Sequence, residues 1–284
     1  MHSPAIAPPL WTTRSGRWLA FGEPVPAGFW LGAQALALWP HWRWAAARLN
    51  DGSDDPLGLA ALAVVAWAVW RLGPRMRAAP ARGWLLTTVG LTLAATAAHF
   101  VAPALVAALL AALAVAALLF GFLPVGVPQL PLAGLAALSL PVVSSLQFYA
   151  GYPLRVATAE LSTWLLRAAG MSAQRDGTAM AVEGRLVIVD APCSGVQMVW
   201  MAYFCACTVA LWSELPDRVF LRRLAGVGAV VLAGNVLRNG VLVALEAHDT
   251  MSSPAVHEAI GLGMLALVCA AVVALVRGGR DAPR

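Results

Sequence analysis

The chain has 284 residues, of which 60% are hydrophobic and only 12% are charged, and its mean hydropathy is +0.75. A soluble domain of this length has about a quarter of its residues charged, so a soluble globular fold is excluded and lipid must cover much of the surface. The net charge of +5 rests on 19 basic residues, all of them Arg. Basic cytoplasmic loops of a membrane protein account for such an excess, and we expect no nucleic-acid binding.

Apolar segments of roughly the ~20 residues that span a bilayer follow one another along the chain. They predict an all-α polytopic membrane protein with about eight transmembrane helices. The segments lie near residues 25–44, 56–72, 84–103, 104–123, 131–150, 194–213, 220–246 and 258–276.

Most of the arginines fall in loops that would lie on one side of the membrane if the chain has eight spans. Clusters precede the first span, follow the second and the sixth, and end the chain, near residues 14–17, 71–82, 218–223 and 277–284. The positive-inside rule assigns these loops to the cytoplasm. The sequence therefore predicts a multi-pass membrane protein with both termini cytoplasmic.

The longest segment between spans, residues 151–193, is then extracytoplasmic. Apolar residues at helical spacing between Leu154 and Ala169 predict an amphipathic helix at the membrane surface, with Gly170 as its C-cap. Thr178–Val182 and Arg185–Val189 flank Glu183-Gly184 and predict a small β-hairpin between spans five and six. We expect residues 1–150 to form a membrane scaffold of about five spans, and residues 151–284 to carry the chemistry.

Cys193 is the first candidate for chemistry, because it stands at the start of the sixth span. A thiol at a helix N-terminus gains from the partial positive charge there, which favours the nucleophilic thiolate. Ser194 and Gly195 follow, and they allow a substrate backbone to approach closely and offer N–H groups to an oxyanion. The alternative is an inert cysteine at the membrane interface.

Arg238 is the second candidate, because it falls inside the seventh apolar segment, in its outer half. A charge there costs at least ~2–3 kcal/mol, so its side chain should face the helix bundle or a wet cavity. Asn235 shares its helix face and Asn239 follows it. The alternative is an arginine that reaches the outer interface along its own aliphatic stem.

Histidine supplies the third candidate. His257 opens the eighth span, where a helix start fixes its direction, and it is better placed than His248 in the preceding loop. His99, at the outer end of the third span, is weaker still. Three consecutive spans would thus bring a thiol, a guanidinium and an imidazole to one depth, a set suited to acyl transfer on a peptide or ester. A metal site is not expected, since no further ligands stand at a readable spacing, and no cofactor is implied.

At these residues the sequence resembles the exosortase and archaeosortase family of membrane-embedded cysteine transpeptidases. The resemblance covers roughly residues 150–265 and lies in Tyr152–Arg155, Ala191–Gly195, Asn235–Asn239 and His257–Gly261. It implies that Cys193 is the nucleophile, Arg238 its basic partner and His257 the general acid and base. Pro192 before Cys193, and Asn239 where an apolar residue is common, indicate a divergent bacterial subfamily.

The resemblance also implies the substrates and partners. They would be exported proteins that end in a tripartite sorting signal: a short Pro-containing motif, one hydrophobic span and a basic tail. Cleavage would be extracytoplasmic, with transfer to a surface acceptor, often alongside exopolysaccharide biosynthesis proteins. Two other classes stay open, namely a transporter in which Arg238 binds an anionic solute, and a non-catalytic membrane partner of an exopolysaccharide export system.

Overall fold

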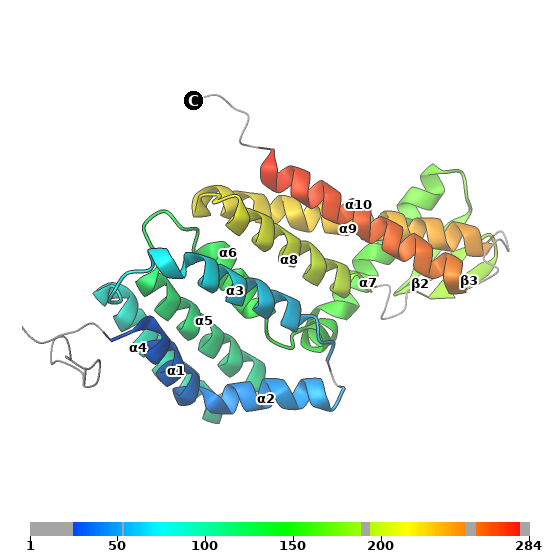
Figure 1. Cartoon of the computed structure of the whole chain (residues 1–284). Helices are drawn as coiled ribbons and strands as arrows, with labels where there is room; N and C mark the ends of the chain where they lie inside the picture. The colour runs from blue at the N-terminus through cyan, green and yellow to red at the C-terminus, as the bar shows by residue number, and fades with distance from the viewer. Residues whose placement is uncertain (1–24, 53, 189–193, 248–253, 279–284) are drawn as a thin grey trace, which may run out of the picture.

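The computed structural model describes residues 25–52, 54–188, 194–247 and 254–278. These residues are mostly helical, and long helices lie side by side with one small sheet near an end of the bundle (Figure 1). The helices are α1 (Ala27–Ala37), α2 (Trp39–Asn50), α3 (Gly58–Leu72), the 3-10 helix η1 (Gly73–Arg75), α4 (Arg82–Val101), α5 (Ala104–Phe122), α6 (Leu130–Leu138), α7 (Val143–Ala168), α8 (Val196–Trp212), α9 (Asp217–Ala247) and α10 (Pro254–Arg277). The strands are β1 (Ala173–Asp176), β2 (Ala179–Val182) and β3 (Arg185–Ile188).

Four of the described helices are long and apolar enough to cross a membrane, namely α4, α5, α9 and α10. The bent pair α6 and α7 would make a fifth span, and α8 is apolar but shorter, with 17 residues. An all-α polytopic membrane fold is therefore confirmed, whereas the predicted count of about eight spans is not.

The first predicted span, residues 25–44, is two helices rather than one. α1 ends at Ala37, and α2 starts at Trp39 with Pro40 in its first turn. Proline lacks the N–H that a continuing helix needs and is best tolerated at a helix start. The chain therefore breaks at Leu38, inside the segment predicted to be one span, and α2 is much less apolar than α1.

The boundary predicted between the fifth span (131–150) and the surface helix (154–169) is also wrong. The chain bends by 98° between α6 and α7, and α7 then runs unbroken from Val143 through Pro153 to Ala168. Pro141 stands at the bend, where it disfavours a helical conformation for Leu140 before it. The helix that leads to the sheet thus begins about eleven residues earlier than expected.

The predicted hairpin is confirmed, and it carries one further strand. β2 pairs with β3 and β1 pairs with β2, all antiparallel. Glu183 and Gly184 link β2 to β3 with φ angles of 50° and 80°, as a two-residue hairpin turn requires. The C-cap of α7 is Ala169 rather than the predicted Gly170, which follows it in the left-handed region with a φ of 87°.

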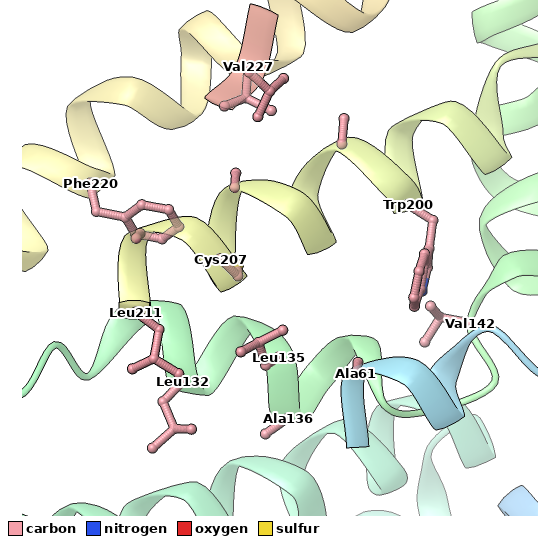
Figure 2. Packing of buried hydrophobic residues seen from close by; sticks show 14 of the residues in the cluster. Ala61, Leu132, Leu135, Ala136, Val142, Trp200, Cys207, Leu211, Phe220 and Val227 are labelled. Carbon is pink, nitrogen blue, oxygen red and sulfur yellow. The ribbon is translucent and has the colours of Figure 1, made fainter. Parts of the chain in front are cut away.

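The main core lies between α6 and α8. Leu132 and Leu135 of α6 face Leu211 and Cys207 of α8, and Trp200 points toward Val142 at the α6–α7 bend (Figure 2). A Cβ atom added to Gly134 would lie only 2.7 Å from the sulfur of Cys207. Small residues allow such close helix packing in membranes, and this contact fixes α8, which begins at Val196.

Candidate functional site

A pocket of about 580 Å³ opens where the start of α8, the later part of α9 and the start of α10 meet. Its polar and small lining residues are Asp55, Gly195, Gln197, Arg238, His257 and Glu258. Gly195, Arg238 and His257, three of the residues predicted from the sequence, therefore lie around one space. Cys193 and His248 lie outside the described residues.

Arg238 lies against a glycine of α10. A Cβ atom added to Gly261 would be 3.4 Å from Nη2 and 3.5 Å from Nε of Arg238. Gly261 stands one helical turn after His257, so both face the same side of α10. The missing side chain at residue 261 lets the guanidinium group lie against α10, one helical turn from His257.

Gly195 has a φ angle of +82°, in the left-handed region that glycine adopts without strain. A Cβ atom there would approach Cγ and Nδ2 of Asn235 to 2.8 Å. Asn235 is buried in α9, and its Nδ2 donates a hydrogen bond to the hydroxyl of Thr158 in α7 at 3.0 Å. Thus α7 holds the asparagine against which the turn before α8 packs.

Asn239 is also buried, one turn further along α9. Its Nδ2 donates to the backbone carbonyl of Asn235 at 2.9 Å. A polar side chain in an apolar segment must find such a partner, since leaving it unpaired costs free energy. Asn239 therefore supports the helix turn that carries Arg238.

Ser194 is buried and tied to the start of α7. Its hydroxyl donates to Oε1 of Gln147 at 2.8 Å and accepts from the backbone N–H of Val196 at 3.3 Å. These bonds fix the residue directly after Cys193. Gln147 was not singled out from the sequence, because a lone glutamine at the edge of an apolar segment carries no pattern.

The loop between α2 and α3 is attached to the same end of α7. The buried carboxylate of Asp54 accepts hydrogen bonds from the backbone N–H and the hydroxyl of Ser144, at 3.3 and 2.8 Å. Arg48 forms an ion pair with Asp54 at 3.8 Å. Ser144 and Gln147 are one turn apart, so the first turns of α7 position two loops at once.

Asp55, the next residue, reaches the pocket itself. Its Oδ2 accepts a hydrogen bond from Nε2 of Gln197 at 3.0 Å, across 142 positions of sequence. The part of the chain predicted to be scaffold thus supplies one wall of the pocket. An Asp-Asp-Pro sequence before an apolar helix is typical of an ordinary helix start, which concealed this contact.

His99 lies apart from the pocket. Its ring meets that of His41 edge-to-face, with centroids 5.5 Å apart. Burial lowers the pKa of His41, and the neighbouring His99 lowers it further. Among the described residues, no group of three or more His, Cys, Asp or Glu side chains is placed to hold a metal ion.

A protein-family model described as transmembrane exosortase matches residues 44–274. The match extends beyond the region of residues 150–265, and it includes the Asp54–Asp55 loop as well as the three helices around the pocket. Comparisons with curated proteins and with solved structures gave no match.

Proposed function

Because the chain belongs to the transmembrane exosortase family, we propose that it is a membrane-embedded cysteine peptidase or transpeptidase. Its membrane fold and its family agree with a transpeptidase role in general terms. The substrates proposed are exported proteins that end in a Pro-containing motif, one hydrophobic span and a basic tail. Exopolysaccharide biosynthesis proteins are the proposed neighbours.

The observation that carries the proposal is the shared pocket of Gly195, Arg238 and His257. These residues come from three helices, and Gly195 stands two residues after the only cysteine that the sequence puts near a helix start. A guanidinium and an imidazole around one concave space suit covalent catalysis at a thiol.

In the proposed reaction His257 takes the proton of the Cys193 thiol, and the thiolate attacks the carbonyl carbon of the scissile peptide bond. Arg238 stabilises the negative charge that develops on the carbonyl oxygen. His257 then returns the proton to the leaving amine, and a thioester remains on Cys193. Water or an amine attacks this thioester, which frees the thiol and gives hydrolysis or transfer.

We also propose that the pocket opens to the extracytoplasmic side of a bacterial inner membrane, with both chain ends in the cytoplasm. The arginine-rich loops support this orientation, because basic residues near spans are retained inside. The sheet and the start of α10 lie toward the same end of the bundle (Figure 1).

The test is to remove the thiol of Cys193 by substitution with alanine. In Cys193→Ala we expect substrate processing to stop while the protein remains in the membrane at normal amounts. Membrane extracts are compared by immunoblot for the uncut and the cut form of a secreted protein with the C-terminal signal described above. Unchanged processing in Cys193→Ala would disprove the proposed chemistry and leave the transporter or partner roles.

A further inference from the structure

The pocket contains a carboxylate for which the proposed reaction has no use. Asp55 lines the same space as Arg238 and His257, but it comes from the loop before α3 rather than from α8, α9 or α10. Its side chain is partly accessible and keeps one side toward Gln197. A catalytic thiolate gains nothing from an added negative charge, since a like charge disfavours the ionised form. We therefore consider Asp55 as a group that binds a ligand rather than one that activates the thiol.

Contacts on two sides fix the position of Asp55. Asp54, directly before it, is buried and held by Ser144 and Arg48. The backbone N–H of Asp55 also donates to Oδ1 of Asp54 at 3.0 Å. From the other side, the amide of Gln197 donates to Oδ2 of Asp55 at 3.0 Å. A side chain fixed from two directions offers its remaining lone pairs in a defined orientation.

We propose that Asp55, oriented by Gln197, binds a nitrogen cation of the bound peptide or the protonated amine of the acceptor, which gives its proton to neutral His257 before it attacks the thioester. A carboxylate beside a protonated amine or guanidinium forms a charge-assisted hydrogen bond, which is roughly twice as strong as a neutral one. Arg238 would meet the carbonyl oxygen and Asp55 the cationic group. This inference rests on the proposed function and adds to it the chemistry of one subsite.

The thiol of Cys193, two residues before the pocket residue Gly195, gives a probe of the charge near the pocket that needs no substrate. Purified protein in nanodiscs is treated with two methanethiosulfonates of similar size, one carrying a trimethylammonium group and one a sulfonate. The rate of modification at Cys193 is followed by mass spectrometry, with Cys193→Ala as the blank. The ratio of the cationic to the anionic rate reports the local potential.

In Asp55→Asn, which keeps the shape and an oxygen acceptor for Gln197, we expect this ratio to fall by about fivefold at low salt. Asp55→Glu should keep the ratio of the unmodified protein. Asp51→Asn is the matched control, because Asp51 belongs to the same loop and is exposed but does not line the pocket. Its ratio should stay within twofold of the original.

A second substitution tests the proposal independently, in case the Asp55 variant does not fold. Gln197 is exposed, and Gln197→Lys sets a positive charge beside Asp55 from α8. It should lower the ratio as Asp55→Asn does. A ratio unchanged in both variants would overturn the proposal, as would an equal fall in Asp51→Asn. Neither result depends on whether Cys193 turns over a substrate.

Two sources of the cation are then separated by capturing the thioester from whole membranes. If the cation belongs to the cleaved protein, Asp55→Asn reduces the amount of substrate bound to Cys193. If it belongs to the accepting amine, Asp55→Asn leaves capture intact and prolongs the lifetime of the thioester. Identical capture and lifetime in Asp55→Asn and the unmodified protein would contradict the proposed subsite.

Discussion

At the scale of single residues, the pocket depends on two glycines that allow polar side chains close to helix backbones. Gly261 faces the guanidinium of Arg238, and Gly195 faces the amide of Asn235. The two glycines lead to different predictions, because Gly261 has an ordinary helical backbone, whereas Gly195 is in the left-handed region.

Gly261→Val should displace the guanidinium of Arg238 and lower substrate processing by tenfold or more. The added side chain occupies space that the guanidinium now fills, and small shifts of catalytic groups are costly. Gly263→Val is the control, since a Cβ atom there meets nothing within 4 Å and the helix bears the same β-branched residue. Equal processing in the two variants would show that the contact at Gly261 has no functional weight.

Gly195→Ala should lower stability more than the same change at Gly126. Both glycines have positive φ angles, +82° and +97°, so both variants carry about 1–2 kcal/mol of backbone strain. A Cβ atom at residue 126 meets nothing within 4 Å, whereas at residue 195 it meets Asn235 at 2.8 Å. We expect a further loss of about 1–3 kcal/mol for Gly195→Ala.

The measurement is thermal unfolding of the purified variants in one detergent. If Gly126→Ala unfolds at the same temperature as Gly195→Ala, then Asn235 yields to the added methyl group at no cost.

At the same scale, the sequence singled out Arg238 and His257, which line the pocket, but not the side chains that position the loops and helices around it. Arg238 and His257 were identifiable because a charge inside an apolar segment and a histidine at a helix start are both unusual. Asp55, Gln147 and Thr158 were not, because each looks ordinary among its neighbours. Their roles arise from contacts across 142, 47 and 77 positions, which a single sequence does not reveal.

At the scale of elements, the packing of α8 against α10 brings Gly195 and His257 together. Cys205 in α8 and Cys269 in α10 lie near each other where these two helices pack together. Cys207, two residues on, faces the other way toward Gly134 of α6. The three cysteines therefore report on two different helix interfaces.

Mild oxidation of membranes with copper phenanthroline should join Cys205 to Cys269 in a disulfide. Cys207 should stay a thiol, which provides an internal control within the same helix. The bond is detected by mass spectrometry of non-reduced peptides from protein that carries Cys193→Ala. A disulfide between Cys207 and Cys269 in place of Cys205 would contradict the orientation of α8.

Element boundaries show where hydropathy stops being informative. The turn of the hairpin was predictable, because Glu183-Gly184 between two β-prone segments has a local conformational cause. The bend between α6 and α7 was not, since residues 131–150 are apolar on both sides of it. A hydropathy profile indicates which residues lie in lipid. The direction of the helix after the bend depends instead on Pro141 and on the residues that pack against the bend.

At the scale of the whole molecule, the division into residues 1–150 and 151–284 stays a prediction. The pocket crosses this boundary, because Asp55 stands on one side of it and His257 on the other. The family match crosses it too, from residue 44 to residue 274. The first half of the chain is therefore involved in the site as well as in the support of the later helices.

The short length of α8 leads to a prediction about the depth of the pocket in the membrane. Its 17 residues extend over about 26 Å, less than the ~30 Å hydrocarbon thickness of a bilayer. Trp212, at the far end, is 65% exposed, as expected for an interfacial anchor. An α8 that crosses the bilayer with Trp212 at one interface would put Gly195 a few Å below the opposite interface.

A pocket at a fixed depth would make cleavage depend on the distance between the cleavage motif of the substrate and the membrane. A substrate anchored by its own hydrophobic span presents its cleavage motif at a height set by the residues between the two. Three residues inserted there extend an unfolded spacer by up to about 10 Å, and we expect processing to fall sharply while the motif itself is unchanged. Equal processing of the lengthened substrate, followed by immunoblot, would mean that the chain reads the motif alone and not its distance from the membrane.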